Sequence, residues 1–544
     1  MKGRNLGRCS ISQFKWLESL YEAVTEGQDI PLLPESTPPV SIPAPTVGEI
    51  RAIIANFRNS TSPGSDMINV ELLKKAPDEF VEKLHELIAV VWNSNVPPAD
   101  FIDTVQVPIP KKPSPKATTD FRKITLCNVV YKVIATHLLY KLDEVTGELP
   151  TYQAAFLANR SVEDHIFTSK RITEEYWNHG ISLYALALDI RQAFDSVSHA
   201  AVIEALQTLG VPNFLVNRRT PKVSKGKGVK QGCPLSPRLF TLVLHWILLK
   251  LKQLHPSVNL EHSVGMKPPF ILAYADDLMI ITSSLKEMDE IMWSLRSLLE
   301  EVGLIIHPEK TELLIRDPYE TKDARLEQHI VGGFHLTSKA SVRYLGAYLT
   351  ATVNRPESVK RRCSQGSRVS KAILPFLKKN RVPWDIARRI YRSVVVPTVV
   401  FGLNAISLTA GNRRTLRHFE RKTVQEWYKA CGGVTIASTR SLLLKKTIIK
   451  TIVINRVTYW GHISRRMANH LLQAAFNLKI ELPKRKCRPC DTWMQTLEKE
   501  LAVFGKVKED FVSLLLDKAA LKKEVRKIYL LPEASDSEDE SDDN

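Results

Sequence analysis

Two adjacent carboxylates, Asp276 and Asp277, stand inside one of the most apolar stretches of the chain, residues 270–281. The apolar residues on either side have the composition of two short buried strands, which places the pair at the turn between them. An ionised pair is costly to bury among aliphatic side chains unless a cation neutralises it. Asp-Asp is also ordinary turn chemistry, so the dipeptide alone does not separate a metal site from a plain turn.

A third carboxylate in a similar setting favours the metal site. Asp189 ends the apolar, strand-like run 182–189, and residues 190–197 predict a turn into a helix. Three carboxylates at strand ends can hold two cations about 3.5–4 Å apart, which clamp the attacking and leaving oxygens of a phosphoryl transfer. Mg²⁺ suits such a site, with Mn²⁺ as the alternative, because carboxylates, water and substrate phosphates complete its coordination. The sequence therefore predicts a two-metal nucleotidyl-transfer site.

Three motifs, in this order and spacing, carry a family resemblance: Leu188–Val197, Gly228–Phe240 and Tyr274–Asp277. They resemble the palm motifs of reverse transcriptases from non-LTR (LINE-like) retrotransposons, and weaker similarity extends from about residue 45 to about residue 501. The resemblance implies an α+β protein with the right-hand polymerase architecture of fingers, palm and thumb, followed by a mainly helical, basic C-terminal region.

The expected domain boundaries follow from this resemblance and from composition. Helical periodicity, for example, predicts amphipathic helices over 47–58, 80–93 and 285–302. The parts are an N-terminal helix with a Pro-rich linker at 1–45, fingers and upstream helices at 46–181, the palm at 182–350, the thumb at 351–410, the helical basic region at 411–531 and a disordered acidic tail at 532–544.

The resemblance assigns catalytic roles to four residues and a metal role to a fifth position. Asp189, Asp276 and Asp277 would bind the two metal ions, and Ile190 is placed in the same metal-binding and nucleotide-binding set. Lys310, in the Lys-bearing palm turn 303–311, would protonate the leaving pyrophosphate as a general acid. A plain surface lysine is the alternative for Lys310.

Seven further residues are expected to bind the nucleotide. Arg122 and one of Lys111 or Lys112 would grip the triphosphate, although a solvated basic loop also explains the lysines. Phe194 would exclude a ribose 2′-hydroxyl, with a core aromatic ring as the alternative. Support for the base and sugar is expected from three residues of the other two motifs: Gln231, Gly232 and Tyr274.

Net charge agrees with a nucleic-acid-binding protein. The formal charge is +18, and because residues 533–544 carry seven acids and no Lys or Arg, the rest of the chain carries +25. Such an excess favours salt-sensitive binding to phosphates. The expected partners are an RNA template, a DNA or RNA primer and deoxynucleoside triphosphates.

The cysteines bear on the compartment and on zinc. There are seven, scattered and odd in number, which indicates reduced thiols in an intracellular setting, nucleus or cytoplasm. No apolar run reaches membrane-spanning length, and no signal-peptide pattern begins the chain. Cys487 and Cys490 lack a second Cys/His pair at suitable spacing, so zinc is disfavoured there.

Two departures from the family pattern bear on function. The segment 211–227 is shorter than in the family, which would misplace Gln231 or destabilise the palm and so impair activity. No endonuclease pattern is found, so an endonuclease supplied in trans is expected. Two alternatives stay open: a catalytically inactive, retrotransposon-derived nucleic-acid-binding protein, and a group II intron maturase, against which the C-terminal resemblance argues.

Overall fold

The computed structural model describes residues 43–94, 98, 104–211, 226–260, 267–317, 327–350, 357–434, 438–483 and 491–531. The chain divides into two compact units, each assembled from three stretches. Unit 1 comprises 1–149, 190–254 and 295–306, and unit 2 comprises 150–189, 255–294 and 307–544. The predictions for 1–42, for 212–225, for Cys487 and Cys490, and for the acidic tail fall outside the described residues.

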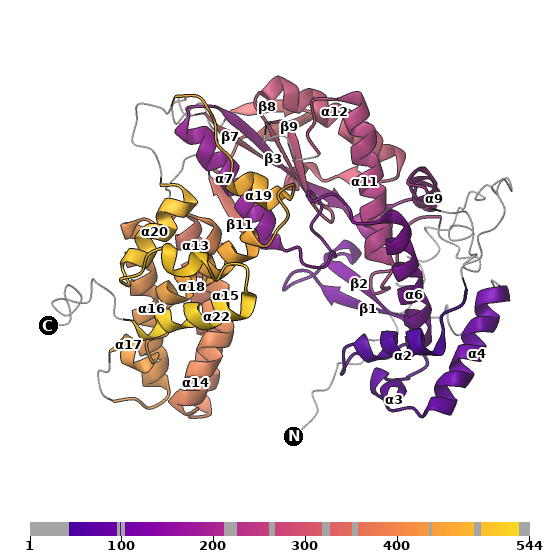
Figure 1. Ribbon diagram of the computed structural model, residues 1–544, viewed down its shortest axis with the longest axis horizontal. Helices are drawn as coiled ribbons and strands as arrows, with labels where there is room; N and C mark the ends of the chain where they lie inside the picture. The colour runs from indigo at the N-terminus through magenta and orange to yellow at the C-terminus, as the bar shows by residue number, and fades with distance from the viewer. Residues whose placement is uncertain are drawn as a thin grey trace. The chain divides into compact units, whose positions relative to one another are not determined.

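Unit 1 begins with a small helical core. Its first helix starts with a capping box, in which Thr46 and Glu49 satisfy each other's backbone N–H groups. Apolar residues at helical spacing, such as Ile50, Ile53 and Ile54, are buried against the next helices. The helices, drawn in indigo and violet in Figure 1, are α2 (Val47–Asn56), α3 (Val70–Lys74), α4 (Asp78–Ser94) and α6 (Val129–Thr146), which confirms the two helices predicted over 47–58 and 80–93.

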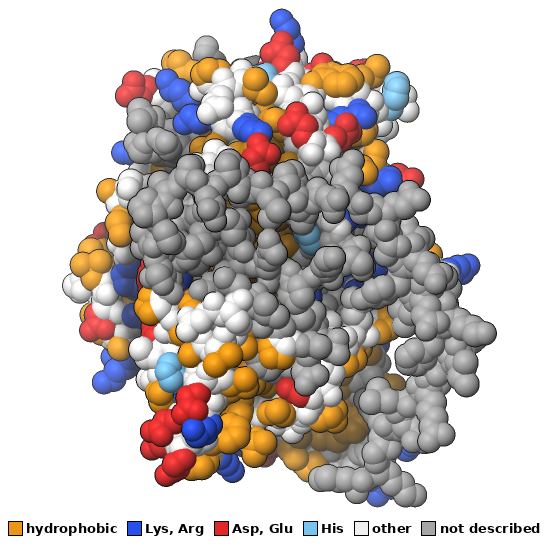
Figure 2. Space-filling model, turned by 90° about the vertical axis from the view of Figure 1, so that its right-hand side faces the viewer, with side chains coloured by type: hydrophobic (Ala, Val, Ile, Leu, Met, Phe, Trp, Pro, Cys, Tyr) orange, Lys and Arg blue, Asp and Glu red, His pale blue; other side chains and the backbone are white. Residues whose placement is uncertain are grey.

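The remainder of unit 1 contains a two-stranded sheet, the Gln-Gly motif (Gly228–Phe240) and the helices around it. Strands β1 (Val105–Pro110) and β2 (Phe121–Leu126) pair antiparallel. Other elements are α8 (Ala193–Ser196), α9 (His199–Thr208), α11 (Ser236–Leu254) and β6 (Ile305–Ile306). Among the residues coloured by type in Figure 2, basic and acidic side chains are interspersed with exposed hydrophobic ones.

Unit 2 is built on an antiparallel sheet in the order β4-β5-β3-β7. Its strands are β4 (Phe270–Tyr274), β5 (Asp277–Thr282), β3 (Leu183–Arg191) and β7 (Glu312–Arg316), and nearly every residue in them is buried or half-buried. Burial on both faces explains why the segments read as continuous apolar runs rather than as alternating ones. Strand β3 continues to Arg191, two residues beyond its predicted end at Asp189, and the turn follows at Gln192 in the left-handed region.

Two hairpins and two helices accompany the sheet of unit 2. Strands β8 (Gln328–Val331) and β9 (Phe334–Thr337) form one hairpin, and β10 (Ser341–Tyr344) and β11 (Ala347–Thr350) form the other. Helix α7 (Val162–Asn178) is buried on all sides. Helix α12 (Leu285–Glu301), which belongs to unit 2 up to Ser294 and to unit 1 from Leu295, confirms the amphipathic helix predicted over 285–302.

From residue 357 onward the described chain is almost entirely helical, as predicted. One core cluster joins the first of these helices, and a second joins the last ones to α7 and the sheet. The helices are α13 (Glu357–Lys379), α14 (Trp384–Ile390), α15 (Val396–Val400), α16 (Ala410–Ala430), α17 (Thr439–Leu442), α18 (Ile448–Ser464), α19 (Leu471–Phe476), α20 (Trp493–Ala502), α21 (Glu509–Val512) and α22 (Lys518–Val525). Within the described ranges, no helix is both long and apolar enough to span a bilayer.

Candidate active site

The Asp276–Asp277 pair lies at a hairpin tip, as the apolar pattern predicts. Tyr274 and Asp277 are register partners at the end of the β4–β5 ladder, so Ala275 and Asp276 form a two-residue turn. Ala275 has a φ of 55°, in the left-handed region that a residue with a Cβ seldom adopts. Its N–H donates to the Oε1 atom of Gln153, over 3.2 Å, and Gln153 is buried. Gln153 therefore holds this turn, although it lies 122 residues earlier in the chain.

Asp189 lies directly opposite Asp277. The two residues are register partners in the antiparallel β3–β5 ladder. The pKa of Asp277 is raised from 3.8 to about 6, because burial removes water from the carboxylate and because Asp276 and Asp189 are close; Arg343 and Lys310 oppose the shift. The structure thus concentrates negative charge at the strand ends where the sequence predicts it.

Lys310 contacts the same cluster. It ends the 3₁₀ turn Pro308–Lys310, and its Nζ atom donates to Oδ2 of Asp189 over 3.0 Å. The backbone supports this turn, since the N–H of His307 donates to the carbonyl oxygen of Asp189 over 2.8 Å. The Lys310 side chain is 61% exposed, so it is free to exchange Asp189 for a ligand. The turn places the ammonium group of Lys310 beside the carboxylates. A surface lysine without a role in the site would not need this position.

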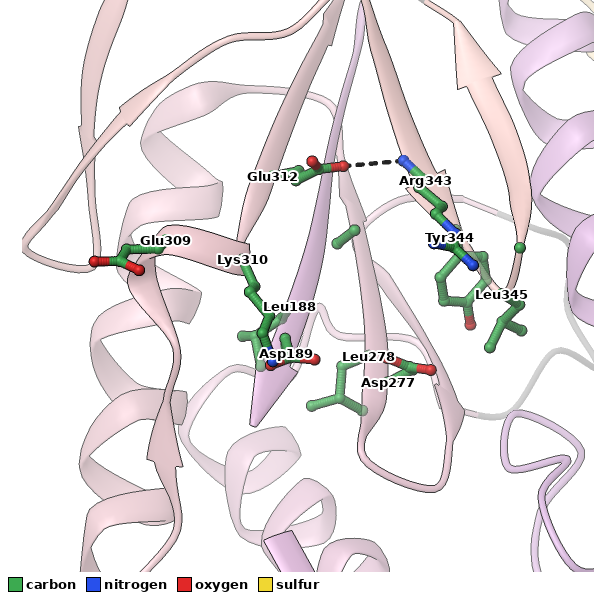
Figure 3. A pocket seen from close by; sticks show the side chains of 12 residues that line it. Leu188, Asp189, Asp277, Leu278, Glu309, Lys310, Glu312, Arg343, Tyr344 and Leu345 are labelled. Atoms are coloured by element: carbon green, nitrogen blue, oxygen red, sulfur yellow. Dashed lines mark hydrogen bonds and ion pairs between the residues drawn. The ribbon is translucent and has the colours of Figure 1, made fainter. Parts of the chain in front are cut away.

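These side chains line an open pocket of about 410 Å³ that lies wholly within unit 2 (Figure 3). Lys310 and Asp189 point toward each other on one side, and Asp277 projects from the neighbouring strand. Asp276 is not among the lining residues, so the structure brings two of the three predicted carboxylates into one pocket. The lining residues are Ala187, Leu188, Asp189, Asp277, Leu278, Glu309, Lys310, Glu312, Arg343, Tyr344, Leu345 and Gly346.

Sequence reasoning missed three charged residues of this pocket, Glu309, Glu312 and Arg343. Glu312 accepts hydrogen bonds from the backbone N–H of Arg343 over 3.0 Å and from Nζ of Lys339 over 2.7 Å. In β10, Arg343 is the exposed residue between two buried ones, Val342 and Tyr344. That alternation is the one signal in the sequence that marks Arg343 as facing away from the core.

The predicted triphosphate ligands lie in unit 1, at the β1–β2 hairpin. Arg122 is exposed on β2 in register with Ile109. Lys112 forms an ion pair with Asp120 over 2.9 Å, and the N–H of Lys111 donates to the carbonyl oxygen of Asp120. The pKa of Asp120 is lowered to about 2, chiefly by hydrogen bonds from two backbone N–H groups and then by the Lys112 ammonium. Lys112 therefore helps to order this loop, whether or not it also binds phosphate.

The Gln-Gly motif packs against the same hairpin within unit 1. The Thr125 N–H donates to the carbonyl oxygen of Gln231 over 2.6 Å. Gly232 has a φ of 129°, and a Cβ there would overlap the Thr125 carbonyl oxygen, so this position requires glycine. Phe194 is half-buried and stacks on Phe240, with ring centroids 4.9 Å apart. The motifs around Phe194 and Gln231 are thus neighbours in space.

Two other predicted site residues, Ile190 and Tyr274, offer no carboxylate to the site. The side chain of Ile190 is buried and apolar, so only its backbone carbonyl oxygen could bind a metal. Tyr274 is half-buried and meets the ring of buried His165 edge to face, with centroids 6.3 Å apart.

The charge at the carboxylates fits a divalent cation. Within the described ranges, no three His, Cys, Asp or Glu side chains are arranged closely enough to form a ready-made metal cage. Mg²⁺ does not need one, since it is usually held by one or two carboxylates together with water and substrate phosphates. The pKa of Asp277 is raised chiefly by burial and then by the neighbouring carboxylates Asp276 and Asp189, and a bound cation would stabilise the ionised form in that environment.

Comparison with known families decides the class of the fold. A family model described as "Reverse transcriptase (RNA-dependent DNA polymerase)" matches residues 109–349, a range that contains every predicted site residue. Residues 109–349 are a reverse transcriptase domain. The match, together with the mixed helix and sheet architecture, confirms the predicted α+β right-hand polymerase class.

Relatives of the reverse transcriptase domain come from non-LTR retrotransposons, which confirms the LINE-like resemblance. The chain is 26% identical over 404 residues to the Pol polyprotein of the retrotransposable element R2DM of Drosophila melanogaster, covering 70% of this chain and 36% of that protein. It is 21% identical over 445 residues to the RNA-directed DNA polymerase from the mobile element jockey of the same species, covering 76% and 47%. The chain spans less than half the length of these relatives.

A solved structure of telomerase from Candida albicans, in complex with a fragment of telomeric RNA, also aligns with this chain. The TM-score is 0.31 at 12% identity, over 74% of this chain and 71% of that one. A score this low adds no detail to the assignment of the reverse transcriptase domain.

Proposed function

We propose that this protein is an RNA-directed DNA polymerase of retrotransposon origin, which extends a DNA or RNA primer along an RNA template with deoxynucleoside triphosphates. The observation that carries the proposal is the register pairing of Asp189 with Asp277 in a pocket that also holds Lys310, inside a reverse transcriptase domain. Carboxylates at strand ends beside a lysine are the groups that nucleotidyl transfer needs.

In this mechanism Asp189, Asp276 and Asp277 would hold two Mg²⁺ ions, or Mn²⁺ in their place, with the carbonyl oxygen of Ile190 as a further ligand. Bound ions would activate the primer 3′-hydroxyl and stabilise the negative charge of the transferred phosphate. The ammonium of Lys310, whose Nζ atom lies 3.0 Å from Asp189, is the group placed to donate a proton to the leaving pyrophosphate.

Unit 1 supplies the nucleotide contacts in this proposal. Arg122 and one of Lys111 or Lys112 bind the triphosphate from the β1–β2 hairpin, and Gln231 and Gly232 support the base and sugar. The stacking of Phe194 on buried Phe240 fixes the ring in place. A fixed ring can exclude a ribose 2′-hydroxyl by contact alone, and Tyr274 completes the nucleotide set from the hairpin of the carboxylates.

Helix α13 offers a surface for the template–primer duplex. It contains seven Lys and Arg residues and a single acid, Glu357. Four of the basic residues are exposed at spacings that place them on one face: Lys360, Arg368, Lys371 and Lys378. Contacts from such a face to phosphates position a duplex without reading its sequence. We place the polymerase in the nucleus or cytoplasm, with an endonuclease supplied in trans.

Primer extension on an RNA template tests the proposal. The purified protein is supplied with Mg²⁺ and the four deoxynucleotides, beside Asp189→Asn and Asp276→Asn. Asp385→Asn is the matched control, since Asp385 is an exposed carboxylate of α14, outside the pocket, that forms an ion pair with Arg388 three residues on. We expect extension by the parent and the control, and a loss of at least about a hundredfold in the two site variants, with salt-sensitive RNA binding kept by all four.

Two results would contradict the proposal. One is extension by Asp276→Asn at the parental rate, which would remove the metal role. The other is a folded parent that binds RNA but extends nothing, which would favour the inactive nucleic-acid-binding alternative.

A further inference from the structure

The first turn of α7 contains a buried histidine, His165, that has no role in the proposed chemistry. His165 is 0% exposed, and its Nδ1 atom lies 3.2 Å from the hydroxyl of Tyr344, which is itself buried. The two rings are nearly parallel, at 9°. A polar pair buried this deeply is stable only while the two groups stay hydrogen-bonded to each other. A group that loses its partner cannot form a replacement hydrogen bond with water.

Both residues that His165 meets flank the carboxylates. Tyr344 lines the pocket with Asp189 and Asp277. On its other side, His165 meets the ring edge of Tyr274, the last residue of β4 before the turn that carries Asp276. His165 therefore touches the β4–β5 hairpin and the β10–β11 hairpin at once.

The residue before His165 anchors this turn to the C-terminal helices. Asp164 is buried, and it accepts hydrogen bonds from the Tyr459 hydroxyl over 3.1 Å and from Ser161 Oγ over 2.9 Å. His462 of α18 lies 3.4 Å from the same carboxylate. Tyr459 and His462 both lie in α18, which has no role in the proposed chemistry. The position of His165 is thus set from the C-terminal side, and it cannot shift without breaking these contacts.

We propose that His165 is a positioning residue, which holds the carboxylate hairpin and the Tyr344 hairpin at the spacing that nucleotidyl transfer requires. Tyr459 and His462 of α18 act on the site through their contacts with Asp164. This inference rests on the proposed polymerase function. A displacement of about 1 Å at reacting groups can lower a rate by about a hundredfold, so a spacer between two hairpins is able to control kcat.

Two substitutions separate the components of the His165 contact. His165→Asn keeps a polar atom near the position of Nδ1 and loses the ring, whereas His165→Phe keeps a ring and loses the hydrogen bond. Tyr344→Phe removes the same hydrogen bond from the other side. Tyr391→Phe is the matched control, because Tyr391 is equally buried but lies in the core cluster of α13 to α16, outside the pocket.

Single-nucleotide incorporation by the full-length protein gives kcat and the KM for the deoxynucleotide, and Mn²⁺ titration followed by electron paramagnetic resonance gives metal affinity. For His165→Phe and Tyr344→Phe we expect kcat to fall about tenfold with KM within about twofold, and Mn²⁺ affinity to fall several-fold. The double variant His165→Phe/Tyr344→Phe should lose no more kcat than either single variant, because both changes remove the same hydrogen bond. His165→Asn should keep most of the parental kcat. Tyr459→Phe should show a smaller change in the same direction.

Three results would overturn the proposal. They are losses of kcat that add up in the His165→Phe/Tyr344→Phe double variant, a loss of kcat in Tyr391→Phe as large as that in Tyr344→Phe, and a parental kcat in His165→Phe. If the parent extends nothing, the polymerase function fails separately, and Mn²⁺ affinity decides the positioning role. Unchanged affinity in a folded His165→Phe protein would then reject it.

Discussion

Asp189 and Asp277 are register partners in neighbouring antiparallel strands, and Lys310 donates a hydrogen bond to Asp189 alone of the two. In this arrangement the ammonium group of Lys310 is hydrogen-bonded to Asp189 and not to Asp277. Its pKa is about 6 against an ordinary 3.8, owing to burial first and then to Asp276 and Asp189. The site is therefore electrostatically strained unless a proton or a cation is taken up.

Stability of the metal-free protein should depend on pH through Asp277. Because the folded-state pKa is raised, this group's stabilising contribution is complete below 3.8 and is lost as the pH rises through about 6. In the presence of a chelator, the midpoint of thermal unfolding of the parent should fall relative to Asp277→Asn as the pH rises from 3.8 to about 6, and should level off above that. Parallel curves for the two proteins would contradict the assigned shift, and added Mg²⁺ should oppose the fall.

Lys310→Met should lower the rate of extension much more than it lowers stability. The ion pair with Asp189 is largely exposed, and such pairs contribute at most about 1 kcal/mol. Removal of a general acid costs about a hundredfold or more in rate. The control is Lys339→Met, since Lys339 pairs in the same way with Glu312 of the pocket. Single-turnover rates and urea unfolding compare the two, and equal rate losses would remove the proton-donor role.

Phe194→Ala should relax discrimination against ribonucleotides. The ring is half-buried and held by its stacking on Phe240, so its removal opens space beside the sugar at a modest cost in stability. The ratio of kcat/KM for a deoxynucleotide to that for the matching ribonucleotide is the measurement. We expect the ratio to fall at least about tenfold, equivalent to about 1.4 kcal/mol. An unchanged ratio would leave Phe194 as a packing residue only.

Gly232→Ala should destabilise the protein and reduce nucleotide binding. A Cβ would overlap the Thr125 carbonyl oxygen, and the φ of 129° is unfavourable for alanine. We expect a loss of about 1–3 kcal/mol in the free energy of unfolding. Gly226→Ala is the control, because a Cβ there meets nothing within 4 Å. Urea unfolding of both variants tests this, and similar midpoints would show that the motif can relax.

Arg456→Met should destabilise the C-terminal region strongly. Arg456 and Glu500 form a fully buried ion pair over 2.8 Å, and Arg456 also donates to the carbonyl oxygens of Asn404 and Ile406. Removing one partner leaves Glu500 buried without its cation, which costs about 3–5 kcal/mol. The double variant with Glu500→Gln should recover part of the loss. Chemical unfolding measures both, and a loss below about 1 kcal/mol would mean that water reaches Glu500.

Much of the fold could be predicted because its signals are local. Apolar runs buried on both faces marked β3, β4 and β5, and helical periodicity marked α2, α4 and α12. The extension of β3 to Arg191 could not be predicted from the sequence, because Ile190 and Arg191 belong to the strand through their pairing with β6. Strand pairing is a long-range property, and residue composition records it poorly.

The amino-acid sequence alone identified the carboxylates, the lysine turn and the polymerase motifs, because each needs a particular residue type at a short, fixed spacing. Tertiary structure alone decided which of them share a pocket. It paired Asp189 with Asp277, added Glu312 and Arg343, and placed Gln153 under the turn and His165 beside Tyr344. The partners in these contacts are tens to hundreds of residues apart in the chain, so only the packing of α7 and the hairpins onto the sheet brings them together.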